Sequence, residues 1–315
     1  MEDWRGDPRK AKMKVLKEIS GLEVFQQEPM SRHTTLKIGG PVSTYLSVFS
    51  VEALQKLIRF FKEEGITYMV IGGGSNIVWT DEPLEITVLE LSGLRHIKIL
   101  ERKTNNGEVT VLAGAGLPLL GLVRFAVEEG LEGLEGLSGI PGTVGGAIKG
   151  NAGAFGYEIK DTLYSVKILD KEGELKEVRR EELLFGYRSS SLKDEEIIVE
   201  ALFKLREGSR ESLTRVMRDY IKKKAQRQPL NLPSAGCVFK NPPGDFAGRL
   251  IDEAGCKGMR SGDMEVSTIH ANFIVNRGKG TQRDFLNLLE AVQERVMKRF
   301  QIMLEPEVKI IRSER

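Results

Sequence analysis

The chain has 315 residues, more than one hydrophobic core usually serves, so two or three compact units are expected. Its 40% apolar and 29% charged residues exclude a disordered or collagen-like chain. A formal net charge of +2 provides no strong field for recruiting nucleic acid or an anionic membrane, so we expect neither as a partner.

The chain carries no pattern typical of export or of a membrane anchor. Its start, MEDWRGDPRKAKMK, has no apolar stretch, and the most apolar region, 111–127, is interrupted by three glycines, a proline and an arginine. Cys237 and Cys256 are too few for a disulfide scaffold. We therefore expect a cytoplasmic protein.

A metal site is not expected either. His33, His96 and His270 are far apart in the sequence, and no paired-carboxylate or HExxH pattern accompanies them.

The first predicted elements are a helix and a strand that open onto a glycine-rich loop. Ser50 is a good N-cap, apolar residues from Val51 to Phe61 recur at helical spacing, and Gly65 is a typical stop. The stretch 67–71, TYMVI, predicts a strand that leads directly into Gly72.

The remaining elements follow in the order of an α+β protein rather than in strict βαβ alternation. Strands are expected over 86–91, 109–113, 166–169, 174–178, 197–203 and 302–311. Helices are expected over 118–129 and 211–225, and a third helix begins after the capping box of Thr281 and Asp284 and ends near Phe300.

The first glycine-rich loop is a candidate cradle for an anion. Gly72, Gly73 and Gly74 allow the backbone N–H groups to approach a phosphate, and Ser75 and Asn76 add side-chain donors. No Gly-Lys-Ser/Thr follows, so it is not a nucleotide P-loop. Position 77 is Ile77, where the dinucleotide fingerprint requires a third glycine.

A second glycine-rich stretch runs over 139–147 and continues over 151–156. A tight connection or close strand packing would explain any single glycine in it. For the two loops together, we favour a long phosphate-bearing ligand.

Seven motifs share one resemblance that extends nearly from end to end of the chain. They are HTTLKIGGP (33–41), VIGGGSNIV (70–78), IPGTVGGA (140–147), NAGAFG (151–156), FGYRSS (185–190), SAGCVFKNP (234–242) and LEPEV (304–308). On these residues the chain resembles the UDP-N-acetylenolpyruvoylglucosamine reductase family, in its shorter form.

The resemblance implies an α+β fold: a two-lobed FAD-binding domain of the vanillyl-alcohol-oxidase type and a smaller α+β substrate-binding domain. The expected boundaries are 1–208 for the FAD-binding region, with lobes of about 1–85 and 86–208, then 209–303 for the substrate domain. Residues 304–315 are expected to form a C-terminal strand that carries a catalytic glutamate.

The resemblance also implies the cofactor and the residues that hold it. FAD binds without a covalent link, and NADPH is the hydride donor. The implied FAD-binding residues are Gly72, Gly73, Gly74, Ser75, Asn76, Ile77, Thr143, Gly145, Gly146, Ala147, Ile148, Asn151 and Gly153.

The implied reaction reduces UDP-N-acetylglucosamine enolpyruvate, for peptidoglycan precursor synthesis. Hydride addition to the β-carbon leaves negative charge at the α-carbon, which the adjacent carboxylate disperses only if cationic or hydrogen-bonding groups hold it. Arg188 is the implied clamp, Glu307 the group that helps stabilise the enol, and Cys237 the proton donor in place of the usual serine. Without the resemblance, these three residues would be interpreted as a solvated arginine, an edge carboxylate and a buried thiol.

Two further residues match family positions near the substrate. Arg227 is expected beside the diphosphate, and Asn241 lies in the FKNP motif. The preceding run, Lys222 to Lys224, is expected to be a solvated helix face or part of the entry route for UDP, and not catalytic.

Two other functions remain open from the sequence. One is a different FAD oxidase or dehydrogenase on the same fold, acting on an alcohol or hydroxy acid. The other is a non-catalytic protein that binds flavin or a nucleotide sugar. For the reductase function, no obligate protein partner is expected.

Overall fold

The structure, a computed structural model, describes residues 8–103 and 105–313. The chain divides into two compact units. Unit 1 comprises residues up to 27, 43–72 and 86–217, and unit 2 comprises 28–42, 73–85 and 218 onward. Two short segments from the N-terminal third, 28–42 and 73–85, thus belong to the same unit as the C-terminal part of the chain. The domains predicted from the sequence were contiguous. How cofactor and substrate binding are divided between these regions stays a prediction.

Unit 1 contains a six-stranded sheet in the order β12-β11-β15-β7-β6, with β8 also paired to β15. The neighbouring strands are antiparallel. The strands are β6 (Ile97–Lys103), β7 (Glu108–Gly114), β8 (Leu131–Glu132), β11 (Leu163–Leu169), β12 (Leu175–Arg179) and β15 (Ile197–Glu207). The alternating burial along β15 shows why this strand can lie at the centre: its apolar side chains supply one buried face.

A second sheet has the order β1-β2-β5-β3, with β3 and β5 parallel. Its strands are β1 (Leu22–Pro29), β2 (Pro41–Val48), β3 (Tyr68–Ile71) and β5 (Leu84–Glu90). The helix before β3, α2 (Val51–Glu64), begins and ends as predicted: Ser50 accepts a hydrogen bond from the Ala53 N–H, and Gly65 is left-handed with φ 63°.

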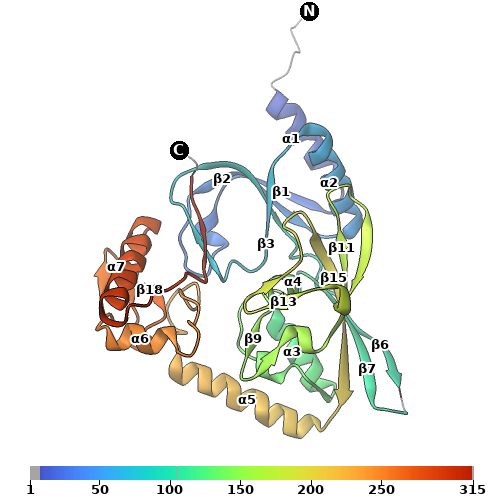
Figure 1. Cartoon of the computed structure of the whole chain (residues 1–315). Helices are drawn as coiled ribbons and strands as arrows, with labels where there is room; N and C mark the ends of the chain where they lie inside the picture. Colours follow the sequence, from blue (N-terminus) through green and yellow to red (C-terminus); the bar gives the residue numbers. More distant parts are fainter. Residues whose placement is uncertain (1–7, 104, 314–315) are drawn as a thin grey trace, which may run out of the picture. The chain divides into compact units, whose positions relative to one another are not determined.

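The remaining elements of unit 1 are short. They are α1 (Pro8–Glu18), α3 (Leu119–Glu128), η2 (Glu135–Leu137), α4 (Val144–Lys149), β9 (Gly153–Ala154), β10 (Tyr157–Glu158), η3 (Ile159–Asp161), η4 (Arg180–Glu182), β13 (Phe185–Gly186) and β14 (Ser189–Ser190). Helices α2 and α3 bury their apolar faces in the same core as β7, β11 and β15. Figure 1 shows these helices and strands. The glycine-rich segment 139–156 includes α4, which packs against the same core.

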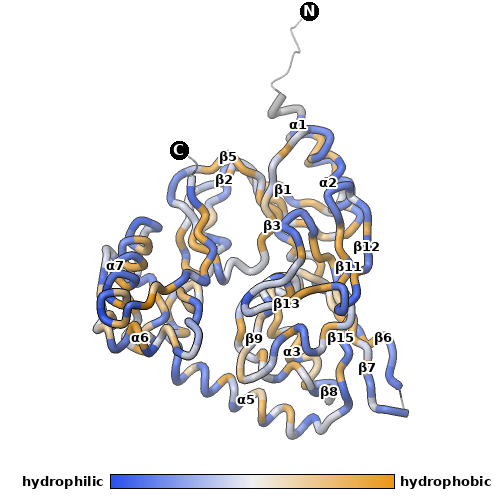
Figure 2. The backbone as a smooth tube through the Cα atoms, viewed as in Figure 1, coloured by the Kyte–Doolittle hydropathy of each residue, from blue (hydrophilic) through white to orange (hydrophobic). Residues whose placement is uncertain are grey.

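The helix α5 (Arg210–Arg227) carries the chain from unit 1 into unit 2. Most of its residues are hydrophilic in Figure 2. In the described ranges no helix combines the length and apolar character needed to cross a membrane.

Unit 2 is built around the predicted helix α7 (Gln282–Phe300). The capping box of Thr281 and Asp284 is present at its start, and its buried side chains include Phe285, Leu288 and Val292. They pack in a second core with α6 and the β16-β17-β18 sheet. The other elements are η1 (Met30–Arg32), β4 (Ile77–Trp79), α6 (Ala247–Glu253), β16 (Arg260–Ser261), β17 (Met264–Val266), β18 (Ile274–Asn276) and β19 (Lys309–Ile311).

Two predicted segments differ from the structure. The C-terminal strand covers only Lys309–Ile311, not 302–311, and pairs in parallel with β4. Pro306 has no N–H to donate to a ladder, and the segment before β19 bonds instead to residues 238–240. The second glycine-rich stretch is not all loop, because residues 144–149 form α4.

Candidate functional site

The predicted cofactor-binding segments of unit 1 meet at Gly72, at the end of β3. A Cβ atom at Gly72 would lie 2.7 Å from Thr143 Oγ1 and 3.9 Å from Gly146 Cα. Only a glycine lets the first loop approach the second at this distance. The structure therefore brings together two glycine-rich segments that are 70 residues apart in sequence.

The second segment is anchored to the end of β7. Thr143 caps α4, accepting a 3.4 Å hydrogen bond from Gly146 N–H. The N–H groups of Val144 and Gly145 donate to the carbonyls of Leu117 and Ala115, both at 2.9 Å. These backbone bonds use two amides of the segment, so the cradle is not a simple row of unbonded N–H groups. Ala147 and Ile148, on the same helix, are buried.

Asn151 is fully buried just after α4 and has a left-handed backbone, with φ 42°. Its Nδ2 donates to Glu158 Oε1 at 3.1 Å and to the Gly186 carbonyl at 3.0 Å. Its Oδ1 has no hydrogen-bond partner among the described residues. An orphaned acceptor of this kind costs stability unless a ligand or water satisfies it.

Arg188 belongs to the same cluster in unit 1. It is the second turn residue of the hairpin formed by β13 and β14, and its φ is 56°. The guanidinium Nη1 donates to the Gly153 carbonyl at 3.3 Å, and the Cζ of the same group lies 5.3 Å from the Tyr187 ring centroid. Arg188 therefore lies beside predicted cofactor-binding residues.

The other predicted residues of the first loop, Gly73 to Ile77, belong to unit 2. Gly74 has φ 61°, and a Cβ there would lie 1.9 Å from the His33 carbonyl oxygen. No other residue fits at that distance. Thr35 connects this loop to Ser234. Its N–H donates to the Gly74 carbonyl at 3.1 Å, and its hydroxyl donates to the Ser234 carbonyl at 2.6 Å. The loop with Ser75 is thus tied to the SAGC segment.

Two predicted catalytic residues, Cys237 and Glu307, come from segments that run side by side in unit 2. The Glu307 N–H donates to the Val238 carbonyl at 2.7 Å. Asn76 Nδ2 donates to the Glu307 carbonyl at 3.2 Å, which connects the same segment to the first loop. Cys237 and Glu307 are both half-buried. The irregular backbone before β19, rather than the expected strand, carries the glutamate.

The predicted substrate residues have different surroundings. The Asn241 Oδ1 accepts a 3.0 Å bond from the Ala247 N–H, the first N–H of α6, a structural role that the sequence pattern did not indicate. Arg227 is exposed at the end of α5. Of the lysine run before it, Lys222 and Lys223 are exposed but Lys224 is buried, which corrects the expectation of a uniformly solvated face.

The histidines of unit 2 have structural partners. His33 Nε2 lies 3.0 Å from Glu28 Oε1, and His270 Nδ1 accepts from the Asn272 N–H at 3.2 Å. Burial lowers the pKa of His270, so it is neutral at pH 7. Among the described residues, no group of three His, Cys, Asp or Glu side chains is placed to hold a metal ion.

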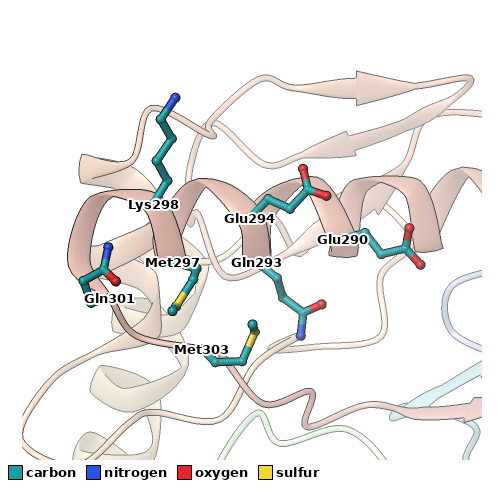
Figure 3. Close-up of a pocket in the computed structure, with 7 residues that line it drawn as sticks. All are labelled: Glu290, Gln293, Glu294, Met297, Lys298, Gln301 and Met303. Carbon is teal, nitrogen blue, oxygen red and sulfur yellow. The ribbon is translucent and has the colours of Figure 1, made fainter.

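A pocket of about 480 Å³ lies on the outer side of α7. Figure 3 shows that Glu290, Gln293, Glu294, Met297, Lys298, Gln301 and Met303 line it. None of the predicted site residues is among them, so this pocket is separate from the candidate site.

These arrangements define a class of protein. Unit 1 brings the two glycine-rich segments, a buried asparagine with an open acceptor and an arginine together, and unit 2 brings together the backbone segments that carry a thiol and a carboxylate. This is the residue chemistry of a flavin-dependent oxidoreductase acting on an anionic substrate.

Comparison with known proteins agrees with this class. Residues 42–179 match the family model of the FAD binding domain, and 228–311 match that of the UDP-N-acetylenolpyruvoylglucosamine reductase C-terminal domain. The UDP-N-acetylenolpyruvoylglucosamine reductase of Heliobacterium modesticaldum is 44% identical, covering 91% of this chain and 90% of the relative. That of Carboxydothermus hydrogenoformans is 42% identical, covering 97% and 99%.

A solved structure gives the same result. The UDP-N-acetylenolpyruvylglucosamine reductase of Thermus caldophilus matches with a TM-score of 0.77 and 36% identity, over 92% of this chain and 99% of that one. The chain belongs to the UDP-N-acetylenolpyruvoylglucosamine reductase family. The predicted α+β fold with a FAD-binding domain of the vanillyl-alcohol-oxidase type is confirmed.

Proposed function

We propose that this chain reduces UDP-N-acetylglucosamine enolpyruvate to UDP-N-acetylmuramate, with NADPH as hydride donor and enzyme-bound FAD, in peptidoglycan precursor synthesis. The observation that carries the proposal is 44% identity over 91% of the chain to a reductase of this name. The product would serve cell-wall biogenesis, and with it cell shape and division.

The residues in unit 1 fit FAD. The close approach of Gly72 to Thr143 and Gly146 places backbone and a hydroxyl side by side, which suits a pyrophosphate. The unpartnered Asn151 Oδ1 offers an acceptor to a donor group. Gly145, Ala147, Ile148 and Gly153 complete this segment, and Gly73 to Ile77 are the proposed contribution of unit 2. When bound, FAD supplies the hydride transfer chemistry from NADPH to the substrate.

The proposed catalytic residues stabilise the negative charge that develops on the substrate and deliver one proton to its α-carbon. Arg188 holds the carboxylate of the enolpyruvyl group, so that the negative charge that develops at the α-carbon is dispersed onto an ion-paired group. Glu307 donates a hydrogen bond to the same developing enol when it is protonated. Cys237 Sγ gives its proton to the α-carbon, which a thiol with an ordinary pKa of about 8.5 can do toward a strongly basic carbanion.

Arg227 and Asn241 are proposed to bind the substrate. The exposed guanidinium of Arg227 suits a diphosphate. Asn241 Oδ1 already accepts the Ala247 N–H at the start of α6, so we assign substrate binding to the amide nitrogen of Asn241. The enzyme is proposed to work in the cytoplasm without an obligate protein partner.

The test is an anaerobic absorbance trace of purified protein reconstituted with FAD. NADPH is added first and UDP-N-acetylglucosamine enolpyruvate second. The proposal expects loss of the flavin band and then its recovery. UDP-N-acetylglucosamine, which lacks the enolpyruvyl group, is the matched control and should give no recovery. Bleaching without recovery would indicate a different FAD reductase, and protein that retains no FAD would overturn the cofactor assignment.

A further inference from the structure

The two-residue strands β9 and β10 pair Gly153 with Glu158. A Cβ at Gly153 would lie 3.0 Å from Glu158 Cγ, so the two residues are in close contact. Glu158 Oε2 forms an ion pair with Lys160 Nζ, and the Glu158 N–H donates to Asp161 Oδ2 at 2.9 Å. The other carboxylate oxygen, Oε1, faces inward to Asn151.

Glu158 reaches the Arg188 hairpin through Asn151. The buried Asn151 amide nitrogen donates one proton to Glu158 Oε1 and the other to the Gly186 carbonyl, two residues before Arg188. With both acceptors in place, the amide cannot rotate without losing two hydrogen bonds. The Glu158 carboxylate therefore fixes the orientation of the Asn151 amide that donates to the Gly186 carbonyl in β13.

A second route runs through the backbone. The Gly153 carbonyl that accepts from Arg188 Nη1 belongs to the strand paired with Glu158. The far side of the hairpin is also tied down, because the Ser190 hydroxyl donates to the Lys149 carbonyl at 2.8 Å. The hairpin is thus held on both strands by the segment 149–158.

Arg188 needs such support. A non-glycine residue with φ 56° is in the left-handed region, which is unfavourable for a side chain with a Cβ atom. A conformation of this kind persists only where surrounding contacts impose it. Hydrogen bonds from Asn151 to Gly186, from Arg188 to Gly153 and from Ser190 to Lys149 are among these contacts.

We propose that Glu158 is a positioning residue for Arg188: it fixes Asn151 and Gly153, and through them the place where the guanidinium meets the substrate carboxylate. This inference rests on the proposed function, in which Arg188 is that clamp. Glu158 itself touches neither substrate nor cofactor in this scheme.

The experiment compares the two half-reactions by rapid mixing of the FAD-loaded enzyme. Glu158→Leu removes the Oε1 acceptor, and Glu158→Gln retains an oxygen there. Lys160→Met is the matched control, since it removes the outer ion pair and leaves Oε1 in place. Glu158→Leu should slow flavin reoxidation by UDP-N-acetylglucosamine enolpyruvate roughly tenfold or more and weaken substrate binding to the oxidised enzyme. Because Asn151 and Gly153 are also proposed to hold FAD, bleaching by NADPH is measured in FAD-saturated enzyme. In Glu158→Leu it should slow by a much smaller factor than reoxidation does. Glu158→Gln and Lys160→Met should keep both wild-type rates.

A double-mutant cycle tests the route through Arg188. In an Arg188→Gln background, Glu158→Leu should add little to the loss of reoxidation rate, because the group it positions is already gone. If Glu158→Leu fails to fold, Glu158→Asp, whose shorter side chain cannot reach Asn151, takes its place in the cycle.

Three outcomes overturn the inference. One is wild-type reoxidation in Glu158→Leu, and another is an effect of full size in the Arg188→Gln background. The third is an equal loss in both half-reactions, which indicates a purely structural role. If the wild-type enzyme itself is not reoxidised by the substrate, the proposed function fails and this inference fails with it.

Discussion

At the scale of single residues, Cys237 is the proposed proton donor. The thiol is half-buried and follows Gly236, whose φ is 79°. A sharp turn of this kind presents the next side chain from the end of the SAG segment, and the neighbouring Val238 holds Glu307 by a backbone bond. The thiol and the proposed enol-stabilising carboxylate therefore come from bonded segments.

The residue-scale prediction concerns the proton. Cys237→Ser should sustain turnover, whereas Cys237→Ala should lower it by about 10²–10⁴-fold, the usual contribution of a positioned general acid. Bleaching of bound flavin by NADPH should be unchanged in both variants. Stopped-flow absorbance with each reactant in turn measures the two steps separately, and undiminished turnover of the alanine variant would refute the role of the thiol.

Single residues of the candidate site were also where sequence reasoning missed most. Glu158 carries no local signal, since a glutamate in a two-residue strand is ordinary surface composition. Its importance comes from Asn151 and Gly186, which are 35 residues apart. The hydrogen bond between Asn241 and the first N–H of α6 was missed for a similar reason. The FKNP motif singles out Asn241 but does not show that Ala247 is its hydrogen-bond partner.

At the scale of elements, the sheet of unit 2 is held by one buried carboxylate. Glu265 in β17 is 2% exposed and accepts from Arg277 Nε and Nη2 at 2.7 Å each and from Arg260 Nε at 2.6 Å. The Arg277 hydrogen bonds, opposed by burial, hold the pKa of Glu265 below its ordinary value. A lowered pKa stabilises the folded state above the unfolded pKa of about 4.3, and this contribution is lost as the pH falls through the folded pKa.

Glu265→Gln should therefore lower the free energy of unfolding at pH 7 by about 2 kcal/mol. The difference from wild type should shrink as the pH falls below about 4. Urea denaturation followed by circular dichroism at several pH values measures this. The control is Glu253→Gln, which breaks an exposed pair with Arg249 and should cost well under 1 kcal/mol. A difference independent of pH would mean that the ionised carboxylate is not the stabilising group.

Most long elements were predictable because their periodicity is local. Helices α2, α3, α5 and α7 and strands β3, β5, β7, β11, β12 and β15 lie where the pattern indicated. Helix α4 was missed because glycine has a poor helix propensity; it forms where Thr143 caps it and β7 anchors it. The C-terminal strand was predicted too long because Pro306 interrupts the ladder.

At the scale of the whole molecule, a cofactor that binds only the folded chain should raise its stability. At a free FAD concentration of a hundred times Kd, the gain is about 2.7 kcal/mol. For 315 residues that unfold together, that corresponds to a rise in Tm of about 4 °C. Thermal unfolding of flavin-free protein with and without FAD measures it, independently of any turnover.

Gly72→Ala gives the matched variant for this experiment. The added methyl group would meet Thr143 Oγ1 at 2.7 Å, so the shift with FAD should be much smaller. The control is Gly121→Ala in α3, where the nearest atom is Leu117 Cδ1 at 3.4 Å, and the full shift should remain. An unchanged shift in the Gly72 variant would remove Gly72 from the cofactor site.

The sequence by itself determined the α+β class, most of the long helices and strands, and the family, because periodicity, caps and contiguous motifs are local properties of the chain. The strands β1, β2 and β6 and the helix α1 were not predicted. Tertiary structure decided which motif residues meet: Gly72 with Thr143, Arg188 with Gly153, and Glu307 with Val238. It also decided that 28–42 and 73–85 join the C-terminal unit. Such contacts depend on how distant segments pack and hydrogen-bond, and no local pattern encodes that.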